Sequence, residues 1–217
     1  AQAELVVAPR FTVALGARGQ FITTRTRTTP GLDTLTLSSS TDGAVVGSVG
    51  STFAATPHLN LVATVGRAFR APNLVEKYFQ GATPEGNGFQ VPNSALKPEQ
   101  SLNVDLGVKY RRDRMYLEAF YYNNTISDAI RIASTGDTVG RFPSFQNVNV
   151  DRIRDQGIET LAEVRLGRGL TVLGHYTWNS AKDAVDADNP VGDGYASKLG
   201  GELAWRAPSG RFFAAYE

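Results

Sequence analysis

Regular alternation of apolar and polar residues is the strongest pattern in this 217-residue sequence. In SLNVDLGVKY (residues 101–110), leucine, valine or tyrosine occupies every even position, and a polar residue or glycine occupies every odd one. YASKLGGELAWR (195–206) alternates in the same sense, with Leu203 and Trp205 opposite Glu202. A period of two is typical of a β-strand that has one apolar face and one polar face. The sequence therefore predicts an all-β protein.

The connections between the expected strands alternate in length. Tight turns are expected at residues 8–9, 55–58, 111–114, 167–169 and 207–210, and long polar connections at 24–43, 68–100, 124–156 and 179–194. Short turns at one end of a sheet and long loops at the other are typical of an up-and-down antiparallel transmembrane β-barrel. We count about ten strands and expect the chain ends to cut the first and the last.

Aromatic residues are expected to form two belts, one near each end of the strands. Those near the tight turns are Phe53, Tyr110 and Trp205, and those near the long connections are Tyr121, Tyr176, Trp178 and Tyr195. Such belts mark the two membrane interfaces of an outer-membrane barrel. A soluble β-sandwich also has alternating strands, but it has no reason to sort loop lengths and aromatic residues by end. The pattern favours the membrane barrel and leaves the sandwich as the alternative.

Composition narrows the classes of function. The 22 Lys and Arg balance 21 Asp and Glu, so no excess of positive charge points to nucleic acid. The chain has no cysteine and two histidines, which removes disulfides and thiolate metal sites and leaves little for histidine chemistry. No apolar run is long enough for a transmembrane helix, and no signal peptide is visible at the first residues. We expect no cofactor, no resident metal and no enzymatic activity.

Two local motifs are weaker than they look. SALK (94–97) fits the S-x-x-K of serine β-lactamases, but no K-T-G follows it and it precedes a strand instead of lying on a helix. DAVDADNPVGD (183–193) has four aspartates and is a candidate calcium loop, although Pro190 stands where a ligand would be needed. We prefer a solvated loop for the second motif and a non-enzymatic role for the first.

Four segments carry a resemblance to a known family. They are LNLVATVGRAFRAPNLVEKYF (59–79), NSALKPEQSLNVDLGVKY (93–110), YLEAFYYNNTISDAI (116–130) and NVDRIRDQGIE (149–159). In this order and spacing they resemble the barrel of TonB-dependent outer-membrane receptors. The sequence departs from the usual family pattern at Asp105, where Glu is commoner, and at Ser94, where Pro is usual.

The resemblance implies most of what we expect of the whole protein. It implies a plugged barrel of the 22-stranded class, of which residues 1–217 would be a partial barrel domain, with the plug absent from this chain. It also implies a bacterial outer-membrane receptor that imports a ferric siderophore, a related iron complex or cobalamin with TonB-derived energy. The partners would be outer-membrane lipid and lipopolysaccharide, the small chelate, and the TonB complex through the plug. The alternative is a structural or adhesive outer-membrane barrel, or a soluble β-sandwich binding module, without a transport role.

The stretch GRAFRAPNLVEKY (66–78) contains the first candidate ligand residues. Pro72 lacks an amide donor, so it should end the strand and turn the chain into a surface loop. Arg67 and Arg70 could contact an anionic ligand, and we favour pairing with carboxylates of the barrel wall or with lipopolysaccharide phosphates.

Further candidates for ligand contact lie in the long connection after Pro72. They are Tyr78, Phe79, Gln80 and Asn87. Residues 73–92 contain no histidine, whereas haem receptors of this family carry one in the corresponding segment, so haem is disfavoured. Siderophore and cobalamin remain equally open at this point.

Overall fold

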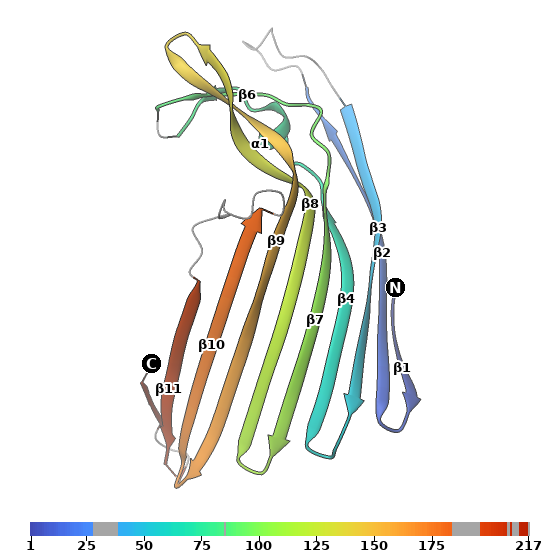
Figure 1. The fold of residues 1–217 in the computed structure, drawn as a ribbon, viewed down its shortest axis with the longest axis vertical. Helices are drawn as coiled ribbons and strands as arrows, with labels where there is room; N and C mark the ends of the chain where they lie inside the picture. Colours follow the sequence, from blue (N-terminus) through green and yellow to red (C-terminus); the bar gives the residue numbers. More distant parts are fainter. Residues whose placement is uncertain (28–38, 85, 184–195, 208, 210–212, 217) are drawn as a thin grey trace.

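A computed structural model describes residues 1–27, 39–84, 86–183, 196–207, 209 and 213–216 (Figure 1). Its strands are β1 (Gln2–Ala8), β2 (Phe11–Arg25), β3 (Ser39–Ala54), β4 (Leu59–Arg70), β5 (Gly81–Ala82), β6 (Phe89–Val91), β7 (Glu99–Arg112), β8 (Met115–Val139), β9 (Phe142–Gly167), β10 (Leu170–Asp183), β11 (Ser197–Arg206) and β12 (Phe213–Tyr216). Its one helix in the described part is α1 (Leu74–Tyr78). Among the described residues, no helix is long and apolar enough to cross a membrane.

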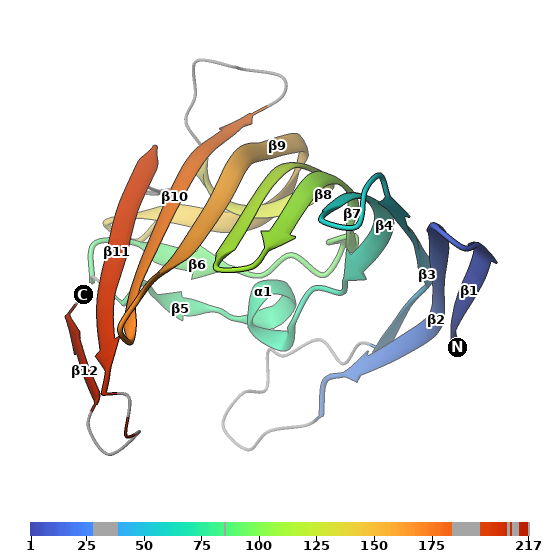
Figure 2. The ribbon, with the colours of Figure 1, turned by 90° about the horizontal axis from the view of Figure 1, so that it is seen from below.

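The sheet is an antiparallel meander, as the alternation predicts. Ten strands pair in chain order from β1 to β4 and from β7 to β12, and the tight turns lie at one end (Figure 1). We call the opposite end the upper end, as in that view. Seen along the strands, the sheet curves as an arc whose concave side holds α1, β5 and β6 (Figure 2). The all-β, up-and-down prediction and the count of ten main strands are confirmed.

Two contacts show which residues line the concave side. Lys77 of α1, which lies inside the arc, bonds to Asp42 of β3, and Glu76 of α1 bonds to Arg70 of β4. Even-numbered residues of β3 and β4 therefore face inward. Because the ladder carries this assignment from strand to strand, Asp105 of β7 faces the concave side and Leu106 the convex side.

The convex face is apolar and open to its surroundings. Many of its large side chains are at least 36% exposed, among them Val49, Phe53, Leu61, Val65, Leu102, Leu106, Val108, Leu117, Tyr121, Ile158, Val172, Tyr176, Leu203 and Trp205. In the described part of the chain, the buried residues with apolar side chains are few: Pro72, Leu96, Ala129, Ile153 and Ala207. The sheet therefore encloses no conventional core, which a β-sandwich would require, and its apolar surface suits a lipid environment.

Aromatic rings lie flat on glycines along the concave face. A Cβ atom on Gly107 would lie 2.3 Å from a ring carbon of Phe120 on the neighbouring strand. A Cβ atom on Gly157 would lie 2.2 Å from the Trp178 carbonyl oxygen and 2.6 Å from the Tyr122 hydroxyl. Glycine is required where a ring or backbone approaches this closely. A larger side chain at either glycine would collide with these neighbours on the concave face.

The expected long connection at 124–156 is largely wrong. β8 and β9 continue as one hairpin through this region and turn at Gly140 and Arg141, with a positive φ of 62° at Gly140. The prediction failed because the extension projects beyond the apolar band, so neither of its faces has to be apolar. The backbone ladder maintains the strands there, together with hydrogen bonds from β9 to the connection between β4 and β7.

Candidate ligand-binding site

The connection between β4 and β7 folds across the concave side at the upper end (Figures 1 and 2). We call its described residues, 71–84 and 86–98, the cap. Pro72 is buried and follows the last ladder residue, Arg70, as expected for a residue that cannot donate to a ladder. Asn73 Oδ1 accepts from the Glu76 amide (2.9 Å) and Glu76 Oε2 accepts from the Asn73 amide (2.8 Å). This capping box starts α1 directly after the proline.

Arg70 links the end of β4 to both the cap and the neighbouring strand. Its Nε donates to Glu99 Oε2 at 2.5 Å, and its Nη1 donates to Glu76 Oε1 at 2.9 Å. Glu99 also accepts the Ile130 amide through Oε1 at 2.7 Å. One guanidinium thus joins two carboxylates, which neutralise its charge. The prediction that Arg70 pairs with wall carboxylates matches this geometry.

Lys77 anchors α1 to β3, the strand next to β4. Its side chain is 2% exposed, and its Nζ donates to Asp42 Oδ2 and to Ser40 Oγ, both at 2.9 Å. A charge this deeply buried is tolerated only because it is paired and hydrogen-bonded. The pair spans from the cap to β3 and fixes the cap inside the arc.

Asparagine side chains attach the cap to β9. The backbone amide of Asn93 donates to the Lys77 carbonyl (3.0 Å), and the side-chain Nδ2 of Asn93 donates to the Asn147 carbonyl (2.8 Å). In return, Asn147 Nδ2 donates to the Glu76 carbonyl at 3.1 Å. These bonds close the cap against the extended hairpin.

Asn149 joins three segments that are far apart in the sequence. Its Nδ2 donates to the carbonyls of Lys97 (3.0 Å) and Asp128 (2.7 Å), and its Oδ1 accepts the Lys97 amide (2.9 Å). Asp128 has a positive φ of 53°, so the hydrogen bond falls where β8 is irregular. Asn93, Glu99 and Asn149 all belong to the segments that carry the family resemblance. Their contacts show that these motif residues shape the cap and its attachment.

Four of the predicted ligand residues lie on the cap. Tyr78 closes α1, and Phe79 and Gln80 follow it; Phe79 is 38% exposed. Asn87 is exposed, and its Oδ1 accepts from Thr83 Oγ1 at 3.1 Å. The structure thus places three of these side chains consecutively and the fourth in the turn between β5 and β6. Their contact with a ligand stays a prediction.

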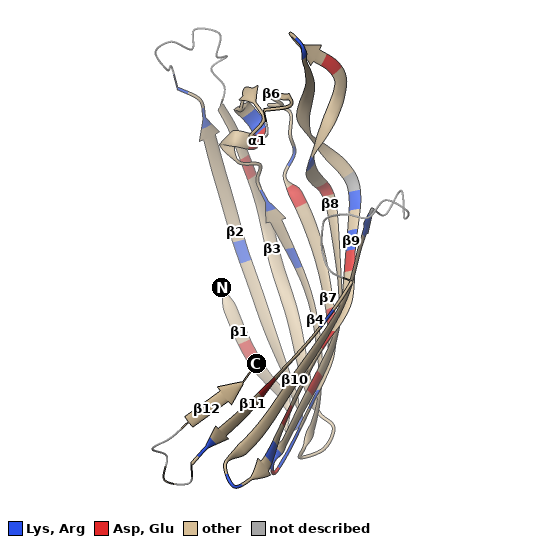
Figure 3. Ribbon diagram, turned by 90° about the vertical axis from the view of Figure 1, so that its left-hand side faces the viewer, with Lys and Arg blue, Asp and Glu red and all other residues tan. Residues whose placement is uncertain are grey.

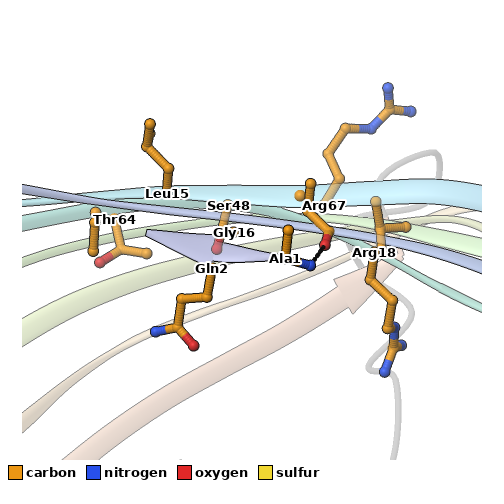
Figure 4. Close-up of a pocket in the computed structure, with 13 residues that line it drawn as sticks. Ala1, Gln2, Leu15, Gly16, Arg18, Ser48, Thr64 and Arg67 are labelled. Carbon is orange, nitrogen blue, oxygen red and sulfur yellow. Dashed lines mark hydrogen bonds between the residues drawn. The ribbon is translucent and has the colours of Figure 1, made fainter. Parts of the chain in front are cut away.

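Arg67 lies apart from the cap, on the convex face. Its Nη2 donates to Gln100 Oε1 at 3.1 Å. Figure 4 shows Arg67 and Leu15 extending from one face of the sheet and Gln2 and Arg18 from the other. The hollow drawn there, about 490 Å³, is lined by residues of both faces, so it follows the sheet at β1 instead of enclosing a ligand.

Sequence reasoning missed a row of hydrogen-bond acceptors on the concave wall. Asn103, Asn124 and Asp155 are direct register neighbours on β7, β8 and β9. The Oδ1 atom of each is buried without a hydrogen-bond partner. Only Asn103 carried a signal, because it lies on the polar face of residues 101–110, whereas Asn124 and Asp155 fall within 124–156, where a long connection was expected. Such a row can accept donors from water or from another polypeptide segment.

The two other motifs have no site in the described structure. Ser94 and Lys97 of SALK are exposed in the cap and belong to no helix, so they lack the buried setting of a β-lactamase site. The aspartate-rich segment 183–193 lies outside the described residues from position 184 onward. Within the described part of the chain, no group of three or more His, Cys, Asp or Glu side chains could hold a metal ion.

Comparison with known proteins identifies the family. Residues 1–215 match the family model described as "TonB dependent receptor-like, beta-barrel". The chain belongs to the TonB-dependent receptor barrels. Members of this family are bacterial outer-membrane proteins, which assigns this chain to the bacterial outer membrane. Its relatives are receptors and transporters, not enzymes.

The individual relatives bind different substances by name, and this chain covers only part of the length of each. The chain is 26% identical over 165 residues to the "Ferric enterobactin receptor PirA" of Pseudomonas aeruginosa, covering 69% of this chain and 22% of that protein. It is 29% identical over 169 residues to a "Heme/hemopexin utilization protein C" of Haemophilus influenzae, covering 69% and 23%. Among solved structures, "Copper transporter OprC" superposes with a TM-score of 0.77 at 20% identity, over 95% of this chain and 31% of that one. At that identity the superposition shows the fold alone.

Proposed function

We propose that the chain is part of an outer-membrane receptor that imports a ferric siderophore or a related iron complex with TonB-derived energy. The observation that carries the proposal is the cap, which is fixed across the concave side by Lys77, Arg70 and Asn149. A rigid cap at the mouth of the barrel would present its exposed side chains to a ligand from outside the cell. In this topology the tight turns face the periplasm.

The proposed ligand contacts are Tyr78, Phe79, Gln80 and Asn87. Phe79 offers an exposed ring and Gln80 an amide, which together suit an aromatic or polar chelate. Arg70 contributes through the cap geometry, because its charge is already matched by Glu76 and Glu99.

Haem is the second candidate because one of the relatives above is named for heme/hemopexin utilization. Residues 73–92 contain no histidine, so the cap offers no axial histidine to haem iron, and Tyr78 is the residue of this segment that could ligate it. Cobalamin is the third candidate, and the same assay covers it. The remaining strands, a plug and its contact with the TonB complex belong to the proposal, since the chain spans 16–24% of the first curated relatives.

The test uses the full-length receptor with a panel of ferric siderophores, haem and cobalamin. We expect one ferric siderophore to bind and its uptake, but not its binding, to require TonB. Phe79→Ala should weaken binding about tenfold, because a stacked aromatic contact contributes roughly 1 kcal/mol or slightly more. Phe53→Ala, an exposed ring at the other end, is the control and should leave binding unchanged. The proposal would be contradicted if haem were the only ligand of the panel to bind. It would also be contradicted if Phe79→Ala and Phe53→Ala bound the siderophore with equal affinity.

A further inference from the structure

Three basic side chains gather on the convex face at the upper ends of β9 and β10. Arg154 is the direct register partner of Lys182, and Arg152 lies two residues further along β9 on the same face. All three are exposed. In Figure 3, basic residues colour the upper part of β9. Like charges placed directly opposite each other on neighbouring strands destabilise a sheet, so the protein alone gives no reason for this arrangement.

Among the residues that the structure describes, no carboxylate neutralises this cluster from its own face. In β4, β7 and β11 and in the paired parts of β8, β9 and β10, no convex register position is Asp or Glu. The acidic residues of these strands face the concave side instead: Glu99, Asp105, Glu118, Asp155, Glu159, Glu163 and Glu202. Arg70 on the concave side has two carboxylate partners, which shows the contrast directly.

The hydrogen bonds of the cluster orient its charge without cancelling it. With its amide oxygen turned toward the guanidinium, Asn123 accepts from Arg154 Nη2 (3.0 Å) and Nε (3.1 Å). Within the described residues, the side chains of Arg152 and Lys182 have neither a hydrogen-bond partner nor an ion-pair partner. A neutral amide fixes the Arg154 side chain and leaves its positive charge available to an anion.

The position of the cluster on the sheet indicates which kind of anion could reach it. Arg154 lies four residues beyond Ile158, or about 13 Å along the strand. Ile158 is 41% exposed and is the register partner of Tyr121 and Trp178, residues of the upper aromatic belt. The cations therefore lie just beyond the apolar band, at the level of lipid headgroups. An imported chelate would travel along the concave side and would not reach them.

We propose that Arg152, Arg154 and Lys182 form a binding site for the phosphate groups of an outer-leaflet lipid, namely lipopolysaccharide. The site uses the lipid-facing side of the barrel and is independent of which chelate is imported. Two guanidinium groups and an ammonium supply several donors to phosphate oxygens, while the acyl chains pack on the apolar residues below.

The experiment compares three forms of the full-length receptor in mild detergent. They are the wild type, the triple variant Arg152→Gln/Arg154→Gln/Lys182→Gln, and the control Arg112→Gln/Arg114→Gln/Arg168→Gln. The control removes the same charge from exposed positions at the tight-turn end. Native mass spectrometry measures binding of bisphosphorylated lipid A, of dephosphorylated lipid A, and of lipid A in competition with inorganic phosphate.

We expect the triple variant to bind bisphosphorylated lipid A about a hundredfold more weakly, because each basic residue near an anionic lipid contributes about a factor of five. The control should bind like the wild type, and all three forms should bind dephosphorylated lipid A equally weakly. Equal binding by the triple variant would overturn the proposal. So would displacement of lipid A by inorganic phosphate at the same concentration, which would indicate a site for a free anion.

Two single variants keep the test decisive if the triple variant does not assemble, as judged by heat-modifiable gel mobility. Arg154→Gln and Lys182→Gln should each weaken lipid A binding about fivefold, and unchanged binding by both would overturn the proposal. Chelate uptake is measured separately on the same variants and should be retained. The lipid site and the transport function can therefore fail independently.

Discussion

The convex and concave faces of β7, β8 and β9 are built from alternate residues of the same strands, yet they differ in polarity and in how far their side chains are exposed. Leu106 on the convex face is 51% exposed, whereas its neighbour Asp105 on the concave face is partly buried. A water-soluble protein reverses this relation and buries its apolar face. The comparison teaches that the convex face is suited to an apolar environment, and that the concave face holds charge beside the cap and other polar groups.

The largest expected effect comes from removing a charge that reaches the concave wall. Lys77→Met would leave Asp42 without its partner, and breaking a buried ion pair in this way costs about 3–5 kcal/mol. We expect the cap to detach, which hydrogen exchange of the α1 amides and proteolysis of residues 71–98 in the full-length receptor would report. Lys97→Met is the matched control, because that side chain is exposed in the same cap. If the cap were equally protected from exchange and proteolysis in Lys77→Met and Lys97→Met, the buried ion pair would not be what holds the cap on the concave face.

A charge placed on the convex face tests the other side. Leu106→Arg should cost roughly 2–4 kcal/mol and impair assembly, because a basic residue near the membrane midplane is exposed to lipid. Asp105→Arg should be much milder, and Leu106→Trp should be tolerated, since lipid accepts a larger ring more easily than a packed core does. Heat-modifiable gel mobility and surface yield of the full-length receptor measure all three. Rejection of Trp as well as Arg would mean that Leu106 packs inside protein.

A smaller effect on stability is expected from alanine at two glycines of neighbouring strands, one on each face of the sheet. Gly157→Ala should cost about 1–3 kcal/mol, because the new methyl group would meet the Trp178 carbonyl and the Tyr122 ring on the concave side. Gly174→Ala on the convex side should be nearly neutral, because a Cβ atom there would have no neighbour within 4 Å. Urea unfolding of the full-length receptor in lipid vesicles compares the two. If the two substitutions lowered the free energy of unfolding equally, Gly157 would not be closely packed on the concave face.

Period-two alternation predicted the strands best where one face meets lipid. It works at residues 101–110 and 195–206, because the two faces there have different environments. It fails at 124–156, where the hairpin of β8 and β9 continues as hydrogen-bonded strand without an apolar face. The same rule could have separated Arg67 from Arg70, since residues three apart on a strand face opposite sides.

The cap could be predicted only in its first turn. Pro72 and the Asn73–Glu76 capping box are local signals in the sequence, and α1 follows them in the structure. Asn149 and Lys97, in contrast, are 52 residues apart in the sequence, and their pairing depends on how the whole sheet curves. The acceptor row of Asn103, Asn124 and Asp155 depends in the same way on the register between strands.

The central claim is that Asp105 and Leu106 face different media, and single thiols test it most directly. The 217 residues contain no cysteine, so Asp105→Cys and Leu106→Cys each add one thiol to this part of a full-length receptor whose other cysteines, where present, are replaced. A bimane label on each is exposed to brominated acyl chains in reconstituted vesicles and to iodide in the buffer. We predict that brominated lipid quenches the label at position 106 strongly and iodide does not, with the opposite result at position 105. Equal quenching at both positions, or the reverse order, would contradict the account.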